Sequence, residues 1–166
     1  MDVSIRPVRA GEHEALGEIT TRAYLDDGLL DFGAADQYVE QLRAVGRRAA
    51  EALVLAAVDP GGLLLGGVTY VTPGSPWTDI AGGDEAELRM LAVSRAARGR
   101  GAGEALVRAC VERARATEGL SGVVLSTQPS MGSAHRIYAR LGFVRTPERD
   151  WSPLPGFTLL TYRLTF

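Results

Sequence analysis

Three glycines alternate with an arginine and an alanine in the stretch GRGAG at residues 99–103, directly before a helix-forming sequence. Backbone N–H groups at the start of a helix have no partner within the helix, and the helix dipole adds partial positive charge there. Glycine lets such a backbone approach a phosphate closely. Arg98 and Arg100 bring further positive charge. The stretch therefore predicts a site for a phosphorylated ligand.

Two common phosphate-binding fingerprints do not fit this turn. The dinucleotide pattern G-x-G-x-x-G requires a third glycine where Glu104 or Leu106 stands. The Walker A loop requires a lysine, and the chain contains none. The spacing that is present is Arg98-x-x-Gly101-x-Gly103. A flexible turn whose arginines are merely solvated is the alternative explanation.

The composition limits the class of protein. The 166 residues suit a single domain, 1–166, with an ordinary globular balance of 46% apolar and 23% charged residues. A net charge of −2 gives no general attraction to nucleic acid or to an anionic membrane. There is no signal-peptide pattern or membrane-spanning run, and the single cysteine fits a reducing compartment. We therefore expect a cytoplasmic protein, and the absence of lysine and asparagine favours a GC-rich, bacterial source.

Hydrophobic periodicity and turn residues predict the elements that must position the turn. We expect helices up to about Tyr24, after an N-cap at Asp36, from the glycine turn to about Ala114, and at 131–142. The expected strands are 3–9, 52–58, 63–71, 86–93, 122–128, 143–145 and 157–164, with 52–58 and 63–71 forming an antiparallel hairpin and 150–156 serving as a linker. This order predicts an α/β fold with a mixed sheet and helices on its faces.

Three motifs in this order resemble the GNAT superfamily of N-acetyltransferases. The turn Arg98-x-x-Gly101-x-Gly103 resembles the family's pyrophosphate-binding loop, AELRMLAV at 86–93 resembles its fourth strand, and SAHRIYARLGF at 133–143 resembles its second cofactor helix. The element order is also the family's, so the resemblance covers nearly the whole chain. It implies a mostly antiparallel sheet and the transfer of an acetyl group from acetyl-CoA to a primary amine by direct attack. A non-catalytic acyl-CoA sensor on the same fold is the alternative.

The resemblance also implies which residues hold acetyl-CoA. Backbone groups of Leu91 and Val93, with Ala92 between them, would pair with the pantetheine arm. The pyrophosphate would lie on the loop residues Arg98, Gly99, Arg100, Gly101, Ala102, Gly103 and Glu104. Many members have an asparagine for the pantetheine where this chain has Met131, so Ser133 or Gln128 is the expected replacement.

A base must take a proton from the acceptor, because an alkyl ammonium has a pKa near ~10. Glu87 occupies the place of the glutamate base of some family members, and burial would have to raise its pKa from ~4.3. Asp84, Glu85 or water alone are alternatives for this role. In the alternative explanation, Glu87 is a strand residue that is either solvated or flanked by Arg89.

Tyr138 matches the family tyrosine that contacts the cofactor and protonates the leaving thiolate, for which a phenol with a pKa near ~10 is suited. It also lies in an apolar stripe with Ala134, Ile137 and Leu141, so a core tyrosine is the alternative. By the same resemblance, Tyr24, Asp27 and Trp151 belong to the acceptor side, where acids and aromatic rings would suit a cationic amine. An ordinary acidic surface loop explains them equally well.

The remaining reactive side chains predict no further chemistry. His13 and His135 lie far apart without a spaced ligand partner, so we expect no metal site, and helical spacing places His135 on the surface. Cys110 falls within the apolar stripe of its helix and is expected in the core. The expected partner is a small-molecule or peptide amine, with no nucleic acid and no membrane, and exposed strand edges could pair two copies into a homodimer.

Overall fold

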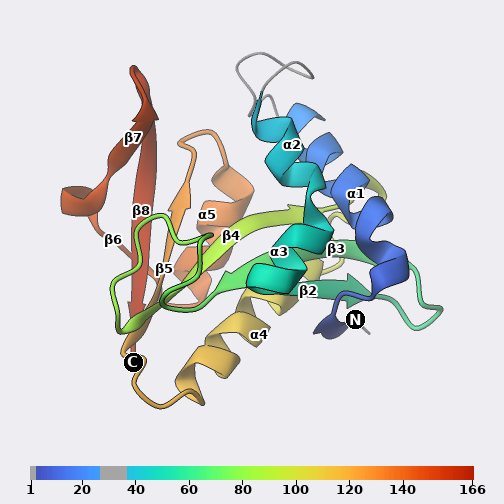
Figure 1. The fold of residues 1–166 in the computed structure, drawn as a ribbon, viewed down its shortest axis with the longest axis horizontal. Helices are drawn as coiled ribbons and strands as arrows, with labels where there is room; N and C mark the ends of the chain where they lie inside the picture. The colour runs from blue at the N-terminus through green and yellow to red at the C-terminus, as the bar shows by residue number, and fades with distance from the viewer. Residues whose placement is uncertain (1–2, 27–36) are drawn as a thin grey trace.

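The computed structural model describes residues 3–26 and 37–166, which form a sheet with helices on both faces (Figure 1). The strands are β1 (Ser4–Pro7), β2 (Leu53–Val58), β3 (Leu64–Val71), β4 (Glu85–Val93), β5 (Gly122–Thr127), β6 (Val144–Arg145), β7 (Trp151–Leu154) and β8 (Phe157–Thr165). The helices are α1 (His13–Asp26), α2 (Tyr38–Arg43), α3 (Val45–Glu51), α4 (Ala102–Arg115) and α5 (Gly132–Arg140), with short 3-10 helices η1 (Ala10–Glu12), η3 (Arg95–Ala97) and η4 (Pro147–Arg149).

The strands follow the order β1-β2-β3-β4-β5-β8-β6, with β7 paired to β8 outside this path. Among the described strands, β4 and β5 form the one parallel pair, and every other pairing is antiparallel. The β4–β5 ladder runs from Glu85↔Gly122 to Leu88↔Leu125, whereas β4 continues to Val93. The expectation of a mixed, mostly antiparallel sheet is confirmed, and the two central strands separate beyond Leu88.

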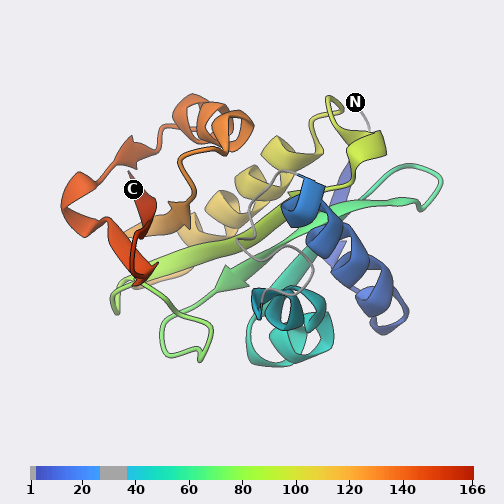
Figure 2. The ribbon, with the colours of Figure 1, turned by 90° about the horizontal axis from the view of Figure 1, so that it is seen from above.

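Different sets of helices cover the two faces of the sheet (Figure 2). Helix α4 packs on one face, with α5 beside it, and it buries the expected stripe of Leu106, Val107, Cys110, Val111 and Ala114. Cys110 is thus a core residue as expected, and burial raises the pKa of its thiol to about 12. Helices α1, α2 and α3 cover the other face over β2 and β3.

The second expected helix is broken into α2 and α3 at Ala44, whose φ of −79° and ψ of 51° are not helical. The cause lies in Arg48, which is 1% exposed and turns back to donate to the carbonyls of Gln41 and Leu42. A guanidinium thereby satisfies carbonyls that a continuous helix would have bonded itself. The expected cap at Asp36 lies outside the described residues.

The expectation of a linker at 150–156 was wrong, because Trp151–Leu154 forms β7 and pairs antiparallel with β8. The prolines Pro153 and Pro155 made this segment look like a loop in the sequence. The strand β7 tolerates Pro153 because it pairs on one side only. Gly156, with a φ of +78°, closes the hairpin with β8. None of the described helices is long and apolar enough to cross a membrane.

Candidate active site

A cleft of about 790 Å³ opens where β4 separates from β5. It is lined by Ala23, Tyr24, Leu91, Ala92, Val93, Ala97, Arg98, Gly99, Gly101, Ala102, Gly103, Glu104, Ser130, Met131, Gly132, Ser133, Ala134, Arg136, Ile137 and Arg140. A bulge in β4 lies at this opening: Met90 has a φ of +56°, and it is the only non-glycine residue of the described chain with a positive φ. The bulge bends β4 at the point where its backbone groups are no longer paired with β5.

The glycine turn forms one end of this cleft and begins α4. Gly99 and Gly101 have φ values of +80° and +79°, a conformation that glycine adopts without steric cost. The first helical bond runs from the N–H of Ala105 to the carbonyl of Gly101. The N–H groups of residues 102–104 therefore have no acceptor within the helix, and they point outward at its positive end.

Gly103 sets how closely α4 approaches its neighbours. A Cβ added there would lie 3.3 Å from Ile137 Cδ1 and 3.5 Å from Val93 Cγ2. Glycine thus keeps room between the start of α4, the end of β4 and α5, which are the three walls of the cleft. An extended arm with a phosphate at one end fits this shape, because strand backbone lines one part and unpaired N–H groups another.

Most of the residues expected to hold the cofactor line the cleft, with one correction among the loop residues. The side chain of Arg100 lies 4.0 Å from Asp59 in the turn between β2 and β3, and it does not line the cleft. At the other end, Ser133 and Met131 line the cleft and Gln128 does not, so Ser133 is the better candidate to replace the family asparagine. Arg136 and Arg140 of α5 also line it, and they escaped the sequence-based prediction because only their helix phase places them there.

Glu104 is an acid in the first turn of α4, where a phosphate is expected. Its carboxylate lies 2.8 Å from Arg140 Nε and 3.4 Å from Arg108. The hydrogen bond from Arg140 lowers the pKa of Glu104, so it is a charged carboxylate at neutral pH. The two arginines offset this negative charge, which would otherwise oppose an anion at the helix terminus.

Tyr138 lies in the core beside the cleft, 5% exposed, and it is not among the residues that line the cleft. The centroid of its ring lies 5.8 Å from that of Phe143 and 5.7 Å from that of Tyr162. Burial raises the pKa of Tyr138, so the phenol stays protonated at neutral pH. Tyr24 does line the cleft, and burial raises the pKa of its phenol, with smaller contributions from Tyr38 and Tyr138.

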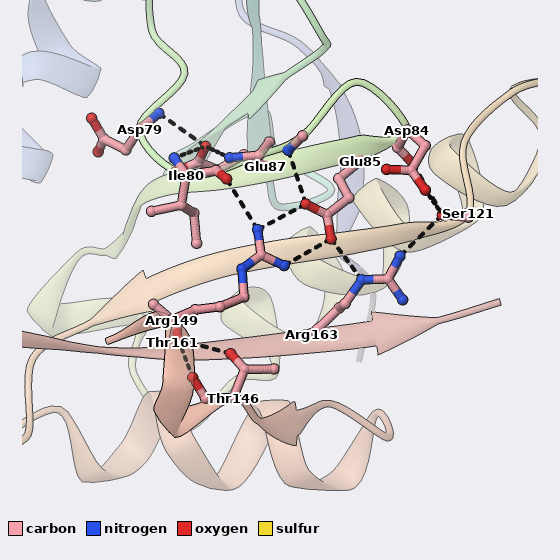
Figure 3. Close-up of polar contacts among 12 residues, drawn as sticks. Asp79, Ile80, Asp84, Glu85, Glu87, Ser121, Thr146, Arg149, Thr161 and Arg163 are labelled. Atoms are coloured by element: carbon pink, nitrogen blue, oxygen red, sulfur yellow. Dashed lines mark hydrogen bonds and ion pairs between the residues drawn. The ribbon is translucent and has the colours of Figure 1, made fainter. Parts of the chain in front are cut away.

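Glu87 is fully buried, which contradicts the alternative of a solvated strand residue. Its Oε1 accepts hydrogen bonds from the backbone N–H groups of Asp79, Ile80 and Ala81, at 3.0, 3.0 and 3.1 Å (Figure 3). Its Oε2 has no partner among the described residues. Burial raises the pKa of Glu87, and the three N–H groups oppose that shift. Glu87 therefore lies beneath a loop and not on the cleft wall.

The two alternative acids are engaged elsewhere. Glu85 accepts from Arg149 at 2.9 Å and from Arg163 at 2.6 Å, and the hydrogen bond from Arg149 contributes most to lowering its pKa to about 2. A carboxylate with so low a pKa is a poor proton acceptor. Asp84 is hydrogen-bonded to Ser121 at the far end of β4 (Figure 3).

The acceptor residues are only partly brought together. Tyr24 packs at 6.1 Å from the ring of Tyr38, at the end of the cleft. Trp151 lies on β7, where its Nε1 donates to Ser126 Oγ at 2.9 Å, and it does not line the cleft. Asp27 lies outside the described residues.

Neither histidine contributes to the cleft. His135 is half-buried and not on the surface as expected, since its Nε2 lies 3.0 Å from the carbonyl of Gln128 and 3.3 Å from Thr127 Oγ1. No group of three or more histidine, cysteine, aspartate or glutamate side chains within 3–26 and 37–166 could hold a metal ion.

Comparison with known proteins gives a family and a set of structural neighbours. The model of the acetyltransferase (GNAT) family matches residues 14–143. No curated protein matches the chain.

Many solved structures share its fold. They include an acetyltransferase of the GNAT family from Staphylococcus aureus (15% identity, 98% of each chain covered, TM-score 0.74) and a GCN5-related N-acetyltransferase from Kribbella flavida (22%, 99% of this chain and 98% of that one, 0.71). A third is a phosphinothricin acetyltransferase from Sinorhizobium meliloti in complex with acetyl-CoA (17%, 100% of this chain and 89% of that one, 0.73). At these identities, the likeness establishes the common fold.

Proposed function

The chain belongs to the GNAT acetyltransferase family, and we propose that it transfers the acetyl group of acetyl-CoA to a primary amine by direct attack. The family resemblance of the sequence motifs is thereby confirmed, as is acetyl-CoA as the cosubstrate of the family. Acetyl transfer is the activity of the family. The amine acceptor and the residues that handle its proton are the proposal.

The observation that carries the proposal is the continuity of the cleft from the start of α4 to Tyr24. One end presents the unpaired N–H groups of residues 102–104, which suit a pyrophosphate. The middle offers the backbone of Leu91 and Val93, freed where β4 leaves β5. The far end lies at Tyr24, and Tyr138 belongs to α5, whose residues Ala134 and Ile137 line the cleft. A bound acetyl-CoA would supply an activated thioester at this far end.

Tyr138 is the proposed acid. The C–N bond forms as the C–S bond breaks, and the sulfur that leaves as a thiolate needs a proton to prevent its return. A phenol kept neutral by burial can give that proton, and the nitrogen, which must lose one on becoming an amide, can restore it. Glu87 was the sequence-based candidate for the base that first deprotonates the ammonium.

The test is incubation of the purified protein with acetyl-CoA and a panel of polyamines, amino acids, aminoglycosides and peptide N-termini, followed by mass spectrometry. We expect acetylated amine, and we expect Tyr138→Phe to lower kcat about 100-fold while acetyl-CoA still binds. Tyr70→Phe is the matched control, because Tyr70 is also a buried phenol, 2% exposed, in the core under α4.

Two outcomes would count against the proposal. If acetyl-CoA binds but no amine in a widened panel is acetylated, the chain is an acyl-CoA sensor on the same fold. If Tyr138→Phe and Tyr70→Phe turn over equally well, the hydroxyl of Tyr138 has no role in the transfer.

A further inference from the structure

Three side chains at alternate positions of β4 hold one loop segment across the sheet. Glu85, Glu87 and Arg89 face the same side of the sheet, because side chains of a strand alternate between its two faces. Residues 77–82, which we call the strap, cross over all three. Glu85 accepts from the N–H of Gly82 at 2.9 Å, Glu87 accepts from three consecutive N–H groups, and Arg89 donates to the carbonyl of Trp77 at 2.9 Å.

The strap is also fastened from the other side. Arg149 of η4 donates to the carbonyl of Ile80 at 3.0 Å while it pairs with Glu85 (Figure 3). The indole of Trp77 is 7% exposed, and its Nε1 donates to Glu51 at 3.1 Å. The segment is thus fixed at both ends and in the middle by side chains of β4, η4 and α3.

The geometry of Glu87 suits an anchor and not a base. A general base must reach the proton directly at about 2.6–3.2 Å or through one water. Glu87 Oε1 already accepts three hydrogen bonds, and its Oε2, which has no partner among the described residues, is buried with the rest of the residue and does not line the cleft. An oxygen that accepts three N–H groups holds those groups in place, as a ligand would in an anion-binding loop.

Asp79, by contrast, is the carboxylate that the strap presents. Its Oδ2 lies 3.1 Å from Arg89 Nε, and 29% of its side chain is exposed. No hydrogen bond to its Oδ1 is formed within the described part of the chain. Its own backbone N–H is one of the three that Glu87 holds, so the position of Asp79 depends on Glu87.

A series of contacts joins Asp79 to the end of the cleft. Arg89, which pairs with Asp79, also donates to the hydroxyl of Tyr38 at 3.2 Å. The ring of Tyr38 packs against that of Tyr24, which lines the cleft. Asp79 is therefore connected through Arg89 and Tyr38 to Tyr24 at the end of the cleft, and it lies outside the residues that line the cleft itself.

We propose that Glu87 is a positioning residue that anchors the strap, and that Asp79, held by this anchor, takes the proton from the acceptor ammonium. The inference rests on the proposed function and names the base of that reaction. The ammonium gives one proton to the carboxylate of Asp79, directly or through one water, and becomes the neutral amine that attacks the thioester. Asp79 then releases this proton to solvent, which accounts for the single proton that the overall reaction liberates.

The charges that face Asp79 come from two elements. Arg89 and Glu87 of β4 lie beneath it, and Tyr38 of α2 lies beside Arg89. Burial raises the pKa of Asp79, and Arg89 opposes the shift. The base must be ionised to work, so its contribution to kcat/KM appears as pH rises through this pKa and is lost below it.

The test compares Asp79→Asn, Glu87→Gln and Glu87→Leu on the amine that the panel identifies, with Glu112→Gln on the exposed side of α4 as control. Asp79→Asn should lower kcat about 100-fold and remove the acidic limb of the kcat/KM profile, with unchanged affinity for acetyl-CoA. Glu87→Gln should cost less than about five-fold, because its amide oxygen can accept the same three N–H groups. Glu87→Leu should cost more than about ten-fold, because the anchor is gone.

The opposite ranking of kcat would overturn the proposal. If Glu87→Gln is as inactive as Glu87→Leu, and Asp79→Asn turns over almost as fast as the unmodified protein, Glu87 is the base. The proposed anchoring of the strap by Glu87 can also be measured without enzymatic turnover. Amide hydrogen exchange at residues 79–81 should be slow in the unmodified protein and in Glu87→Gln, and fast in Glu87→Leu. Should the protein acetylate no amine at all, the proposed function fails and the assignment of Asp79 fails with it. Equal exchange in all three proteins would refute the anchor alone.

Discussion

Two regions of the molecule are built differently: the cofactor half, which is the cleft, and the proposed acceptor half, which is the strap with the side chains that hold it and does not line the cleft. At the cofactor end, the binding groups are backbone N–H and strand edge, exposed by Gly99, Gly101 and Gly103 and by the separation of β4 from β5. At the acceptor end, buried charged side chains of β4 hold the strap by hydrogen bonds and ion pairs. The cofactor half thus depends on backbone conformation, and the acceptor half depends on hydrogen bonds and ion pairs between side chains and the strap.

This difference determines how each half should respond to change. A backbone site fails when φ is altered, even where no contact is lost. A site made of buried pairs fails when one partner is removed, because the other charge is left without compensation in a place that water cannot reach. In the acceptor half, removing the buried carboxylate of Glu85 should therefore act through stability, whereas substitutions in the glycine turn should act through affinity.

The largest effect is expected at Glu85, which holds Arg149, Arg163 and the N–H of Gly82. Glu85→Gln should lower the free energy of unfolding by about 2–4 kcal/mol at pH 7, because two guanidinium groups lose their shared carboxylate. Urea unfolding measures it. Glu18→Gln is the control, since 55% of the Glu18 side chain is exposed and its pairs should contribute less than about 1 kcal/mol.

The same carboxyl gives a pH test. Its pKa is lowered in the folded protein from an ordinary 4.5 to about 2, chiefly by the hydrogen bond from Arg149. The stabilisation is complete above about pH 4.5 and is lost as pH falls toward 2, so the unmodified protein should lose up to about 3 kcal/mol over this range. Glu85→Gln should lack this part of the loss. If Glu85→Gln and Glu18→Gln behave alike, buried pairing does not hold the acceptor half together.

The sequence located the glycine turn and the strand that line the cleft, because the determinants of both elements are local. Gly101 and Gly103 stand at fixed offsets before the apolar stripe of α4, and both the turn and the stripe lie within one short window of residues. The order of elements and the mixed sheet followed from the same kind of pattern. The break at Ala44 escaped the prediction, because no proline marks it and the carbonyls before it are satisfied by the distant side chain of Arg48.

The acceptor half could not be predicted in the same way. The bond from Arg149 to Glu85 spans 64 residues, and those from residues 79–81 to Glu87 cross a loop with no period of its own. One usable indication was present: Glu85, Glu87 and Arg89 alternate on one strand and so must share a face. That indication places three charges together but does not say which of them is buried under the strap and which is left exposed.

An intermediate effect is expected at Gly101 and tests the cofactor half by conformation alone. Gly101 has a φ of +79°, and an added Cβ would meet nothing within 4 Å, so only backbone strain opposes a side chain. Gly101→Val should cost about 1–2 kcal/mol or shift the turn out of the left-handed region. Because the shift moves the N–H groups, the Kd for acetyl-CoA should rise at least about ten-fold in titration calorimetry.

Gly119 supplies the matched control. It too has a positive φ, +92°, with open space around its Cβ, but it lies in the turn between α4 and β5 and does not line the cleft. Gly119→Val should lower Tm by a similar amount and leave the Kd unchanged. A Gly101→Val variant that binds acetyl-CoA as tightly as Gly119→Val does would show that the turn is not the binding element.

The smallest effect is expected at Arg140, where charge enters the cofactor half. Arg140 is the nearer of two arginines that offset the carboxylate of Glu104 at the start of α4. Arg140→Ala should raise the Kd for acetyl-CoA about three-fold at low salt and less at 0.5 M salt, because exposed charges are screened.

The double variant Arg140→Ala with Glu104→Gln separates two causes of this effect. If Arg140 acts by neutralising Glu104, removing both charges restores the affinity, because nothing then opposes the anion at the helix terminus. If the weakening persists in the double variant, Arg140 contacts the ligand itself, and a side chain of α5 joins the backbone as a binding group. That second result would narrow the contrast between the halves, since the cofactor end would then depend on pairing as well as on conformation.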